Sequence, residues 1–298
     1  MTPPGLIAIT GATGFTGRHV VEEARRQYPD ASIRCLVRSE AGAADMERRG
    51  VSHVRGDLHD EASLARLFDG ADTLLNVASL GFPWVDTLFG AVGRATLRRG
   101  VFVSTTAILT TLPVRSKPVR EHGERLVQSS GLDWTILRPT MIYGTPDDRN
   151  IIRLIRLIDR VPVIPIVAPD ALQQPVHVAD VARAVVDVLR FPSTIGHSYN
   201  IAGQEPLTLR ALFAQTAAAL GRRRLFLPVP LAPIRAGVRL YGALAAHPRL
   251  KVEQVDRLGE HKAFRYDEAG CDFGYAPRSF ADGIAAEVHL YRARSEQG

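Results

Sequence analysis

Short apolar runs alternate with helical patterns over the first 140 residues of the chain. The runs lack strict alternation of apolar and polar residues, which is typical of strands covered on both faces. Between them apolar residues recur at helical spacing, as at Val20, Val21 and Ala24. The predicted strands are Leu6–Thr10, Ser32–Val37, His53–Arg55, Thr73–Val77, Val101–Ser104 and Thr135–Leu137. Such alternation predicts βαβ units, and hence an α/β fold with a doubly wound parallel sheet.

The pattern changes at about Ile151, where longer helical segments replace the alternation. The further elements that we expect are helices at Ile151–Ile158, Val178–Leu189 and Leu207–Leu220 and a strand at Ser198–Ile201. The proline-rich stretch Val161–Pro169 cannot form regular structure for long. We therefore expect a nucleotide-binding domain at residues 1–150, to whose sheet residues 175–202 return. Residues 151–298 would form a smaller, mostly helical C-terminal substrate lobe.

Composition is that of an ordinary soluble globular protein, with 46% hydrophobic and 23% charged residues. The two cysteines, Cys35 and Cys271, are too few for a disulfide framework or a zinc site, so we expect a reducing, cytoplasmic setting. The chain also lacks a recognisable signal peptide and any run of 18 apolar residues. The nearest approach, Leu225–Leu250, is broken by prolines and arginines. A peripheral membrane contact through Ile234–Ala246 stays open, although a helix of the substrate lobe is favoured.

The net charge is +6, and Lys117, Lys251 and Lys262 are the only lysines among 37 basic residues. A basic surface favours anionic ligands. The arginines are nevertheless scattered, aromatic residues make up only 7%, and no nucleic-acid-binding motif is found. We therefore expect no nucleic acid partner.

A glycine-rich turn joins the first predicted strand to the first predicted helix. Glycines stand at 11, 14 and 17, where a tight turn, a close approach to a pyrophosphate and helix–sheet contact require them. Backbone N–H groups and the positive end of the helix then face the phosphates. A dinucleotide is therefore expected to bind here, against the alternative of a glycine turn without a ligand. The residues of this candidate site are Gly11, Thr13, Gly14, Phe15, Thr16 and Gly17.

The stretch Thr-Gly-Ala-Thr-Gly-Phe-Thr-Gly at residues 10–17 strongly resembles the extended and atypical short-chain dehydrogenase/reductases. This superfamily has an NAD(P)-binding Rossmann sheet and includes nucleotide-sugar epimerases and dehydratases. Further matching motifs lie at residues 56–58, 76–78, 103–106, 137–140, 142–144, 175–182, 199–203 and 273–275. Together they are specific for the superfamily but not for one substrate.

The resemblance implies roles for further residues. Asp57 and Leu58 would flank the adenine, and Pro139 would lie beside the cofactor. Asn76, Val77 and Ala78 would follow the adenosine side of the pyrophosphate. Two structural alternatives stay open, in which Asp57 merely caps the next helix and Asn76 merely ends its strand.

Arg38 ends the second predicted strand, 21 residues after Gly17. An acid near this position would hold the ribose diol of NAD, whereas an arginine holds the 2′-phosphate of NADP. Glu40 is two residues beyond Arg38, and no acid occupies the strand end. NADP(H) is therefore favoured over NAD(H), and the alternative is that Arg38 is a surface arginine.

The usual proton-transfer pair of the superfamily, a tyrosine four residues before a lysine, is missing. Counting back from Arg138 through Glu124 places Arg120 at the lysine position and Ser116 at the tyrosine position. Arginine stays protonated, so Arg120 can bind ribose hydroxyls or an oxyanion but cannot act as a base. Ser116 more simply precedes a helix whose first turn contains Pro118.

The remaining candidates for catalysis are a threonine and a tyrosine. Thr106 matches the hydroxyl that the superfamily places after the fifth strand, with Thr105 as a neighbouring alternative. Tyr143 could supply the missing phenol, although we interpret it first as a residue that lines the pocket. His177 is interpreted as a packing residue.

Two functions from different classes follow. The first is an NADP(H)-binding oxidoreductase or nucleotide-sugar epimerase-like enzyme, a monomer or homodimer that acts on a small organic substrate such as a nucleotide sugar. The second is a non-catalytic NADPH-binding sensor or assembly subunit, which loss of the tyrosine–lysine pair makes plausible.

Overall fold

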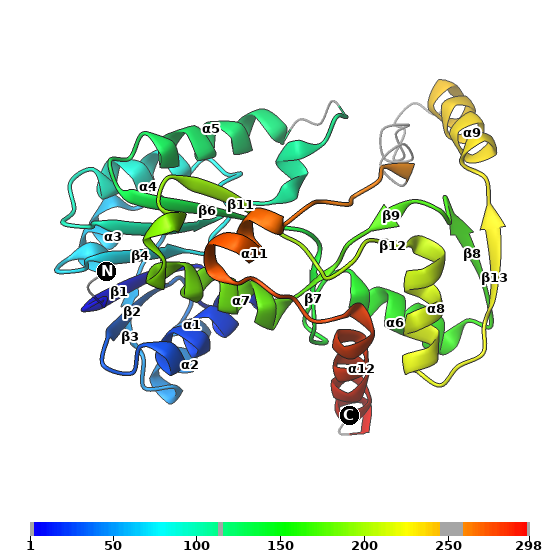
Figure 1. Ribbon diagram of the computed structural model, residues 1–298, viewed down its shortest axis with the longest axis horizontal. Helices are drawn as coiled ribbons and strands as arrows, with labels where there is room; N and C mark the ends of the chain where they lie inside the picture. The colour runs from blue at the N-terminus through cyan, green and yellow to red at the C-terminus, as the bar shows by residue number, and fades with distance from the viewer. Residues whose placement is uncertain (1–2, 113–115, 245–258, 297–298) are drawn as a thin grey trace. The chain divides into compact units, whose positions relative to one another are not determined.

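The computed structural model describes residues 3–112, 116–244 and 259–296, and the chain forms two compact units (Figure 1). Unit 1 comprises Met1–Pro139, Val178–Ile201 and Tyr266–Ala276. Unit 2 comprises Thr140–His177, Ala202–Arg265 and Pro277–Gly298. The chain therefore crosses between the units several times, and neither unit is one continuous segment.

Unit 1 is built on a seven-stranded parallel sheet with the strand order β11-β6-β5-β4-β1-β2-β3. The strands are β1 (Leu6–Thr10), β2 (Ser32–Val37), β3 (Ser52–Arg55), β4 (Thr73–Asn76), β5 (Arg99–Val103), β6 (Asp133–Pro139) and β11 (His197–Ile201). Each strand that the apolar runs predict is present, with ends shifted by a few residues. The predicted α/β fold with a doubly wound parallel sheet is confirmed.

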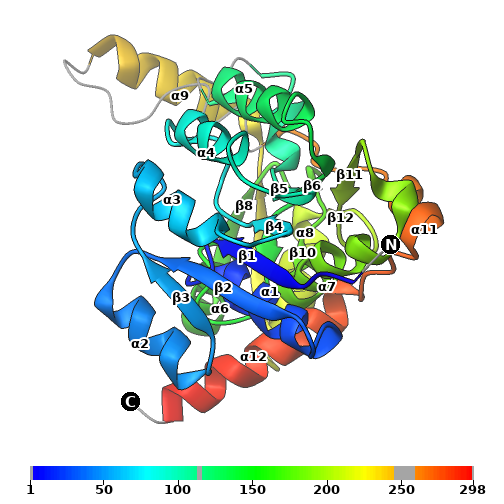
Figure 2. The same ribbon diagram turned by 90° about the vertical axis from the view of Figure 1, so that its left-hand side faces the viewer.

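Helices cover both faces of this sheet (Figure 2). The helices of unit 1 are α1 (Phe15–Gln27), α2 (Glu40–Arg48), α3 (Glu61–Phe68), α4 (Val85–Val92), α5 (Lys117–Gln128), α7 (Val178–Asp187) and α11 (Asp267–Phe273). On one face α3, α4 and α5 bury an apolar cluster that includes Leu64, Leu74 and Phe102. On the other face α1 packs against α7, and Val20, Val21 and Ala24, whose helical spacing predicts α1, are buried.

The strand order reverses direction between β1 and β4. From β1 the chain proceeds outward to β2 and β3, whereas β4, β5 and β6 extend the sheet on the other side. In parallel α/β sheets the crevice outside the carboxyl ends of the strands at such a switch point is where ligands bind. The turn after β1 and the residues after β4 lie at this position.

Unit 2 is smaller and combines helices with two-stranded sheets. Its helices are α6 (Ile151–Arg160), α8 (Leu209–Ala219), α9 (Leu231–Leu244) and α12 (Phe280–Glu296). Its strand pairs are β7 (Ile142–Tyr143) with β10 (Val176–His177), β9 (Leu172–Gln173) with β12 (Leu207–Thr208), and β8 (Val163–Val167) with β13 (Leu225–Val229). Ile155, Leu212 and Ile284 belong to one buried core shared by α6, α8 and α12. Among the described residues, no helix is long and apolar enough to cross a membrane.

The proline-rich stretch Val161–Pro169 corrects one sequence-based expectation, because it contains the five-residue strand β8. This strand pairs in parallel with β13, and Pro165 lies opposite Leu227 in the register. Each of these strands has only one partner, so one of its edges makes no strand hydrogen bonds. A proline, which has no backbone N–H to donate, is tolerated where that position faces the unpaired edge. Prolines therefore restrict this segment to a two-stranded pair rather than excluding a strand.

Glu287 of α12 is a buried carboxyl in the interior of unit 2. Its side chain has no exposed surface, and its Oε2 accepts a hydrogen bond of 3.0 Å from the backbone N–H of Gly144. Burial and the neighbouring Asp148, itself only 6% exposed, raise the pKa of the Glu287 carboxyl to about 10. Glu287 is therefore protonated in the folded protein at neutral pH.

We predict that Glu287→Gln removes a pH dependence of stability. The unfolded glutamate loses its proton above about pH 4.3, whereas the folded one keeps it to a much higher pH. Its stabilising contribution is therefore complete below that pH and is lost as the pH rises towards about 10. Thermal unfolding between pH 6 and pH 9 should show a smaller fall in Tm for Glu287→Gln than for the wild type.

The exposed Glu205 of the same unit provides the control, because Glu205→Gln should retain the wild-type slope. Parallel curves for all three proteins would show that Glu287 is ionised in the folded state.

Candidate functional site

The turn between β1 and α1 folds closely on itself. The N–H of Gly14 donates to the carbonyl of Gly11 over 3.0 Å, and Gly11 has a φ of +70°. A β-carbon on Gly17 would overlap the Gly11 carbonyl, and one on Gly11 would lie 2.7 Å from the backbone nitrogen of Ala78. Gly11 and Gly17 are therefore required by the fold itself.

Gly14 differs from the other two glycines of this turn. Its φ of −72° is open to any residue, and an added β-carbon would meet only the Gly11 carbonyl, at 3.2 Å. The protein thus has little need of glycine here, whereas a ligand that approaches the backbone closely does need it. This small cradle fits the pyrophosphate of a dinucleotide.

The first turn of α1 presents its backbone N–H groups without protein caps. Gly14 is the N-cap residue and makes no side-chain capping bond, and the first turn contains no acidic residue. The positive end of the helix dipole is therefore available to an anion at Phe15, Thr16 and Gly17.

Residues at the end of β4 lie directly against this turn. The side chain of Asn76 is 1% exposed and accepts a 2.6 Å bond from the Thr10 hydroxyl while its amide donates to the Ala78 carbonyl. The N–H of Val77 donates to the carbonyl of Thr10 over 3.1 Å. Asn76 thus joins the ends of β1 and β4 and positions the chain at Val77 and Ala78, rather than only ending its strand.

The end of β2 lies beside the same turn. Ser39 caps α2 by accepting a 3.1 Å bond from the Gly42 N–H, and the methyl group of Thr13 would lie 3.0 Å from a β-carbon on Gly42. Arg38 immediately precedes this cap and is exposed. Glu40, the carboxylate nearest to Arg38 in sequence, forms an ion pair with Arg55.

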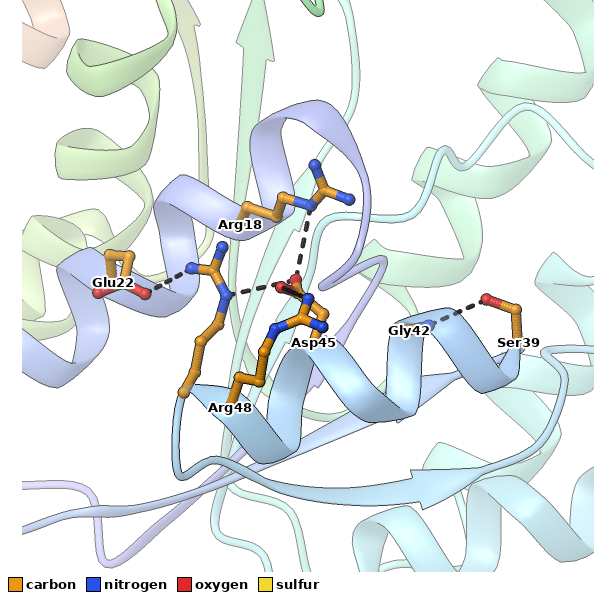
Figure 3. A network of polar contacts seen from close by, with 7 residues as sticks. Arg18, Glu22, Ser39, Gly42, Asp45 and Arg48 are labelled. Carbon is orange, nitrogen blue, oxygen red and sulfur yellow. Dashed lines mark hydrogen bonds and ion pairs between the residues drawn. The ribbon is translucent and has the colours of Figure 1, made fainter.

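An ion-pair network holds α2 against α1 near this strand end (Figure 3). Asp45 of α2 lies 3.7 Å from the Arg18 guanidinium of α1 and 3.1 Å from that of Arg48. Arg49 joins Asp45 to Glu22 of α1 through contacts of 3.3 and 2.6 Å. These contacts join the C-terminal half of α2 to α1, while the Ser39 cap at the N-terminus of α2 directly follows Arg38.

Asp57 and Leu58 follow β3. Asp57 accepts a 2.9 Å bond from the N–H of His59, which makes a local turn. The cap of α3 is Asp60, which accepts from the N–H groups of Ala62 and Ser63. The alternative that Asp57 caps the next helix is thus wrong.

Helix α5 brings Arg120 to the residues that follow β4. A β-carbon on Gly81 would lie 3.1 Å from the Arg120 Cγ, and one on Gly123 would lie 2.6 Å from the Leu80 carbonyl. The half-buried Arg120 side chain therefore lies along the chain at Gly81, five residues after Asn76. The helix starts at Lys117 with Pro118 in its first turn, so Ser116 is the N-cap residue, as predicted.

The register of α5 is held by a buried polar cluster. The carboxylate of Glu124, 4% exposed, accepts from the Arg138 Nε at 3.0 Å and from the Ser104 hydroxyl at 2.6 Å. Ser104 directly follows β5, and Arg138 lies in β6. Because Glu124 is one helical turn beyond Arg120, these contacts also set the position of the arginine.

The two candidate threonines have different surroundings. Thr106 is 5% exposed, and its hydroxyl donates to the carbonyl of Pro139 over 3.3 Å. Thr105 is half-buried and accepts from the Ala107 N–H at 3.2 Å as the cap of the short 3-10 helix η1 (Thr106–Leu109). Thr105 is thus more accessible than Thr106, and Pro139 is joined to Thr106 directly.

Tyr143 belongs to unit 2 and is 1% exposed. Its ring packs on His177 with a centroid distance of 5.4 Å and on Phe280 at 5.2 Å, and its hydroxyl lies against Gly283. The phenol is therefore part of the core of unit 2. The other candidate site residues all lie in unit 1.

Sequence reasoning missed two long-range polar pairings. His122 of α5 lies 2.7 Å from the Asp86 carboxylate of α4. Gln174 donates to the Gly203 carbonyl and accepts from the Phe264 N–H, each over 2.8 Å. Partners so distant along the chain have no local sequence signal.

These features define a Rossmann-type dinucleotide-binding unit. A family model described as NAD(P)H-binding matches residues 11–192, which is more than half of the chain. The protein therefore belongs to this NAD(P)H-binding family, and residues 11–192 carry its NAD(P)H-binding domain.

Three related proteins illustrate the family. A ceramide reductase from Caulobacter vibrioides is 32% identical over 200 residues, which cover 63% of this chain and 62% of the relative. An NADH dehydrogenase (ubiquinone) 1 alpha subcomplex subunit 9 from Dictyostelium discoideum is 28% identical over 68% of this chain and 61% of its own length. Quinone oxidoreductase 2 from Escherichia coli is 26% identical over 80% of this chain and 82% of its own length. The chain thus matches less than two thirds of the first two relatives.

Solved structures show the same fold. A UDP-glucose 4-epimerase from Thermotoga maritima superposes with a TM-score of 0.75 at 17% identity, covering 97% of this chain and 99% of the epimerase. The family model and this shared fold together confirm the predicted NAD(P)-binding Rossmann fold.

We predict that Gly14→Val abolishes NADPH binding without unfolding the chain. The backbone at residue 14 accepts a side chain, but the added atoms would occupy the space in which the backbone approaches the pyrophosphate. Calorimetry should show at least about a tenfold loss of affinity, equivalent to about 1.4 kcal/mol. Unchanged far-UV circular dichroism should accompany that loss.

Gly17→Ala provides the contrast, because its β-carbon would overlap the Gly11 carbonyl and should lower Tm. Wild-type NADPH affinity in a folded Gly14→Val protein would place the dinucleotide elsewhere.

Proposed function

We propose that the protein is an NADPH-dependent reductase of a conjugated, apolar carbonyl acceptor such as a quinone. The observation that carries this proposal is a permanently charged guanidinium, that of Arg120, at the position where the superfamily usually has lysine. When bound, the cofactor supplies a hydride, and the residues of unit 1 hold it and stabilise the charge that develops on the acceptor.

The preference for NADPH over NADH rests on the end of β2. Arg38 is exposed beside the glycine turn, and a guanidinium is a good hydrogen-bonding partner for the 2′-phosphate. The adjacent Glu40 would repel that phosphate, but its charge is compensated by Arg55. Asp57 and Leu58 are assigned to the adenine, as the resemblance implies.

The acceptor is inferred from the groups that the chain lacks at residues 116 and 120. Reduction of a simple ketone produces an alkoxide, a strong base that requires a proton donor on the enzyme. Reduction of a quinone produces a hydroquinone anion, which the ring stabilises and which water can protonate. The balanced reaction is NADPH + quinone + H⁺ → NADP⁺ + hydroquinone. Arg120 can hold the anion without donating a proton, with Thr105 or Thr106 as a further hydrogen-bond donor.

Exposed apolar side chains around Arg120 favour a hydrophobic acceptor over a nucleotide sugar. Phe82, which follows Gly81, is 47% exposed, and Val119, which precedes Arg120, is 39% exposed. Leu109 of η1, which packs on α5, is 43% exposed. We name these three exposed residues, which lie on segments next to Arg120, the apolar rim. A nucleotide sugar would bury its hydroxyl groups against it without hydrogen bonds, at a free-energy cost.

The relatives support a reductase. Ceramide reductase and quinone oxidoreductase 2 are reductases by name, and neither name refers to a nucleotide sugar. The NADH dehydrogenase subunit represents the second possibility, that of a chain which binds the cofactor within an assembly. Turnover of NADPH by the isolated protein separates the two functions. We assign Tyr143 to the core of unit 2 rather than to catalysis, because its phenol is buried.

We predict that Arg38→Glu reverses the cofactor preference. The wild type should bind NADPH more tightly than NADH, because a charged hydrogen bond to the 2′-phosphate contributes about 1.5–3 kcal/mol. The substitution removes that bond and adds repulsion, so NADPH should lose at least about tenfold in affinity while NADH binding changes little. Calorimetry with both cofactors on both proteins measures the change.

Arg25→Glu is the matched control. Arg25 is an exposed arginine in the last turn of α1, away from the glycine turn, and its substitution changes the net charge by the same amount. Equal wild-type affinities for NADPH and NADH would contradict the assignment of Arg38.

We predict that Arg120→Ala lowers kcat/KM for a short-chain quinone by about a hundredfold, the usual loss when one donor to a developing anion is removed. It should also weaken NADPH binding, whereas Arg120→Lys should retain much of that binding and part of the turnover. Steady-state oxidation of NADPH, followed by its absorbance, measures both effects. A panel of nucleotide sugars should give no turnover with the wild type.

Arg125→Ala serves as the control, because Arg125 is exposed on the same helix. If Arg120→Ala behaves as this control does, Arg120 lies outside the reaction centre. If the wild type binds NADPH but none of the acceptors tested causes its oxidation, the reductase proposal fails and the assembly-subunit function is favoured.

A further inference from the structure

Exposed apolar side chains concentrate on one sheet of unit 2. Val163 of β8 is 43% exposed, and Leu225 and Leu227 of β13 are 58% and 44% exposed. Large apolar side chains are seldom left this accessible together on one small element. We name Val163, Pro165, Leu225 and Leu227 the β8–β13 face.

The register of the two strands makes this face continuous. Leu225 lies opposite Val163 and Leu227 opposite Pro165, so their side chains are on the same side of the sheet. The alternate residues Ile164 and Ile166 are 1% and 2% exposed and point inward. Figure 1 shows α6 and α8 on the inner side, and Ile164 joins their core cluster. The sheet is thus apolar on both sides, with only one side covered by these helices.

Arginines stand at one end of the β8–β13 face. Because the strands are parallel, Arg160 and Arg223, which precede β8 and β13, are at the same end, and both are exposed. Their neighbours hold this end in place. Arg222 pairs with Asp159 at 3.0 Å, and Arg224 donates to the backbone carbonyls of α6.

The sequence around β13 has a large positive formal charge. Residues 206–252 contain no aspartate or glutamate. The basic residues of this stretch are Arg210, Arg222, Arg223, Arg224, Arg235, Arg239, Arg249 and Lys251. Its formal charge therefore exceeds the +6 of the whole chain, and the rest of the sequence is slightly acidic.

We infer that the β8–β13 face docks on an anionic phospholipid bilayer. The leucine and valine side chains enter the boundary between headgroups and acyl chains, while Arg160 and Arg223 pair with lipid phosphates. An apolar surface next to the exposed Arg160 and Arg223 matches this boundary in both polarity and charge. The inference extends the molecule's function beyond the reaction of unit 1 and does not depend on it.

Charge argues against a second copy of the chain as the occupant. An isologous contact between two β8–β13 faces would bring the arginines of both copies to one interface. The described carboxylate at this end, Asp159, already pairs with Arg222 and accepts from the Tyr291 hydroxyl. Nucleic acid would use the arginines but leave the leucines in water.

The test is sedimentation of the full chain with vesicles. The wild type should bind vesicles of phosphatidylglycerol and phosphatidylcholine, bind pure phosphatidylcholine more weakly, and be released by salt. Leu225→Glu with Leu227→Glu should lower partitioning by at least about tenfold, because two apolar anchors become charges. Arg223→Glu should lower it about fivefold or more, since each arginine near an anionic surface contributes that much.

Leu290→Glu is the matched control, because Leu290 is 44% exposed on α12 of the same unit. NADPH affinity and oxidation with a water-soluble quinone should be unchanged in every surface variant, which separates this inference from the proposed reaction. It is overturned if the wild type does not bind anionic vesicles, or if the double variant binds as tightly as Leu290→Glu. The face would instead be a self-association surface if the wild type forms a dimer and does not bind vesicles, and if the double substitution, but not Leu290→Glu, makes the protein monomeric.

Discussion

The constraint on which the cofactor-binding unit depends is that two positions in one turn have no room for a β-carbon. At Gly17 it would overlap the Gly11 carbonyl, and at Gly11 it would meet the Ala78 backbone. Only this close fit lets β1 turn directly into α1 while the end of β4 lies against the turn. The first N–H groups of α1 then point out of the carboxyl edge of the sheet, at the topological switch point. Anion binding thus follows from backbone packing before any charged side chain takes part.

A second constraint fixes α5 and the proposed catalytic residue Arg120 relative to the main sheet. Glu124 accepts from both Ser104 and Arg138, so α5 is tied to the ends of β5 and β6. A buried carboxylate with one partner removed would be costly, and the three residues therefore act as a unit. Arg120, one turn earlier, lies against Gly81 as a consequence. The position of a flexible side chain is set by a buried ion pair that does not itself touch the substrate.

The sequence predicts the parts whose signals are local. Apolar runs reveal the strands of the main sheet, and the glycine spacing reveals the turn after β1. Pairings between distant residues have no such signal, as with His122 and Asp86, or Glu287 and Asp148. Prolines in Val161–Pro169 conceal β8, because a strand with a single partner tolerates what a central strand does not. From the sequence, Asp57 and Asp60 are equally good candidates for the N-cap of α3. The hydrogen bonds in the structure show that the cap is Asp60. The roles of Arg38 and Arg120 remain proposals because they concern ligands.

In the proposed alignment Arg120 and Ser116 occupy the positions of the usual lysine and tyrosine, and this replacement changes the chemistry that unit 1 can support. A guanidinium stabilises negative charge at every working pH but transfers no proton, so the proposed acceptor is one that forms an anion which water can protonate. Quinones meet this requirement, and most are apolar enough to lie against Phe82, Leu109 and Val119. An apolar acceptor of this kind partitions into membranes. A cationic, apolar face on unit 2 would keep the enzyme at the bilayer where such a substrate is concentrated, so the two proposals, made from different residues, are chemically consistent with each other.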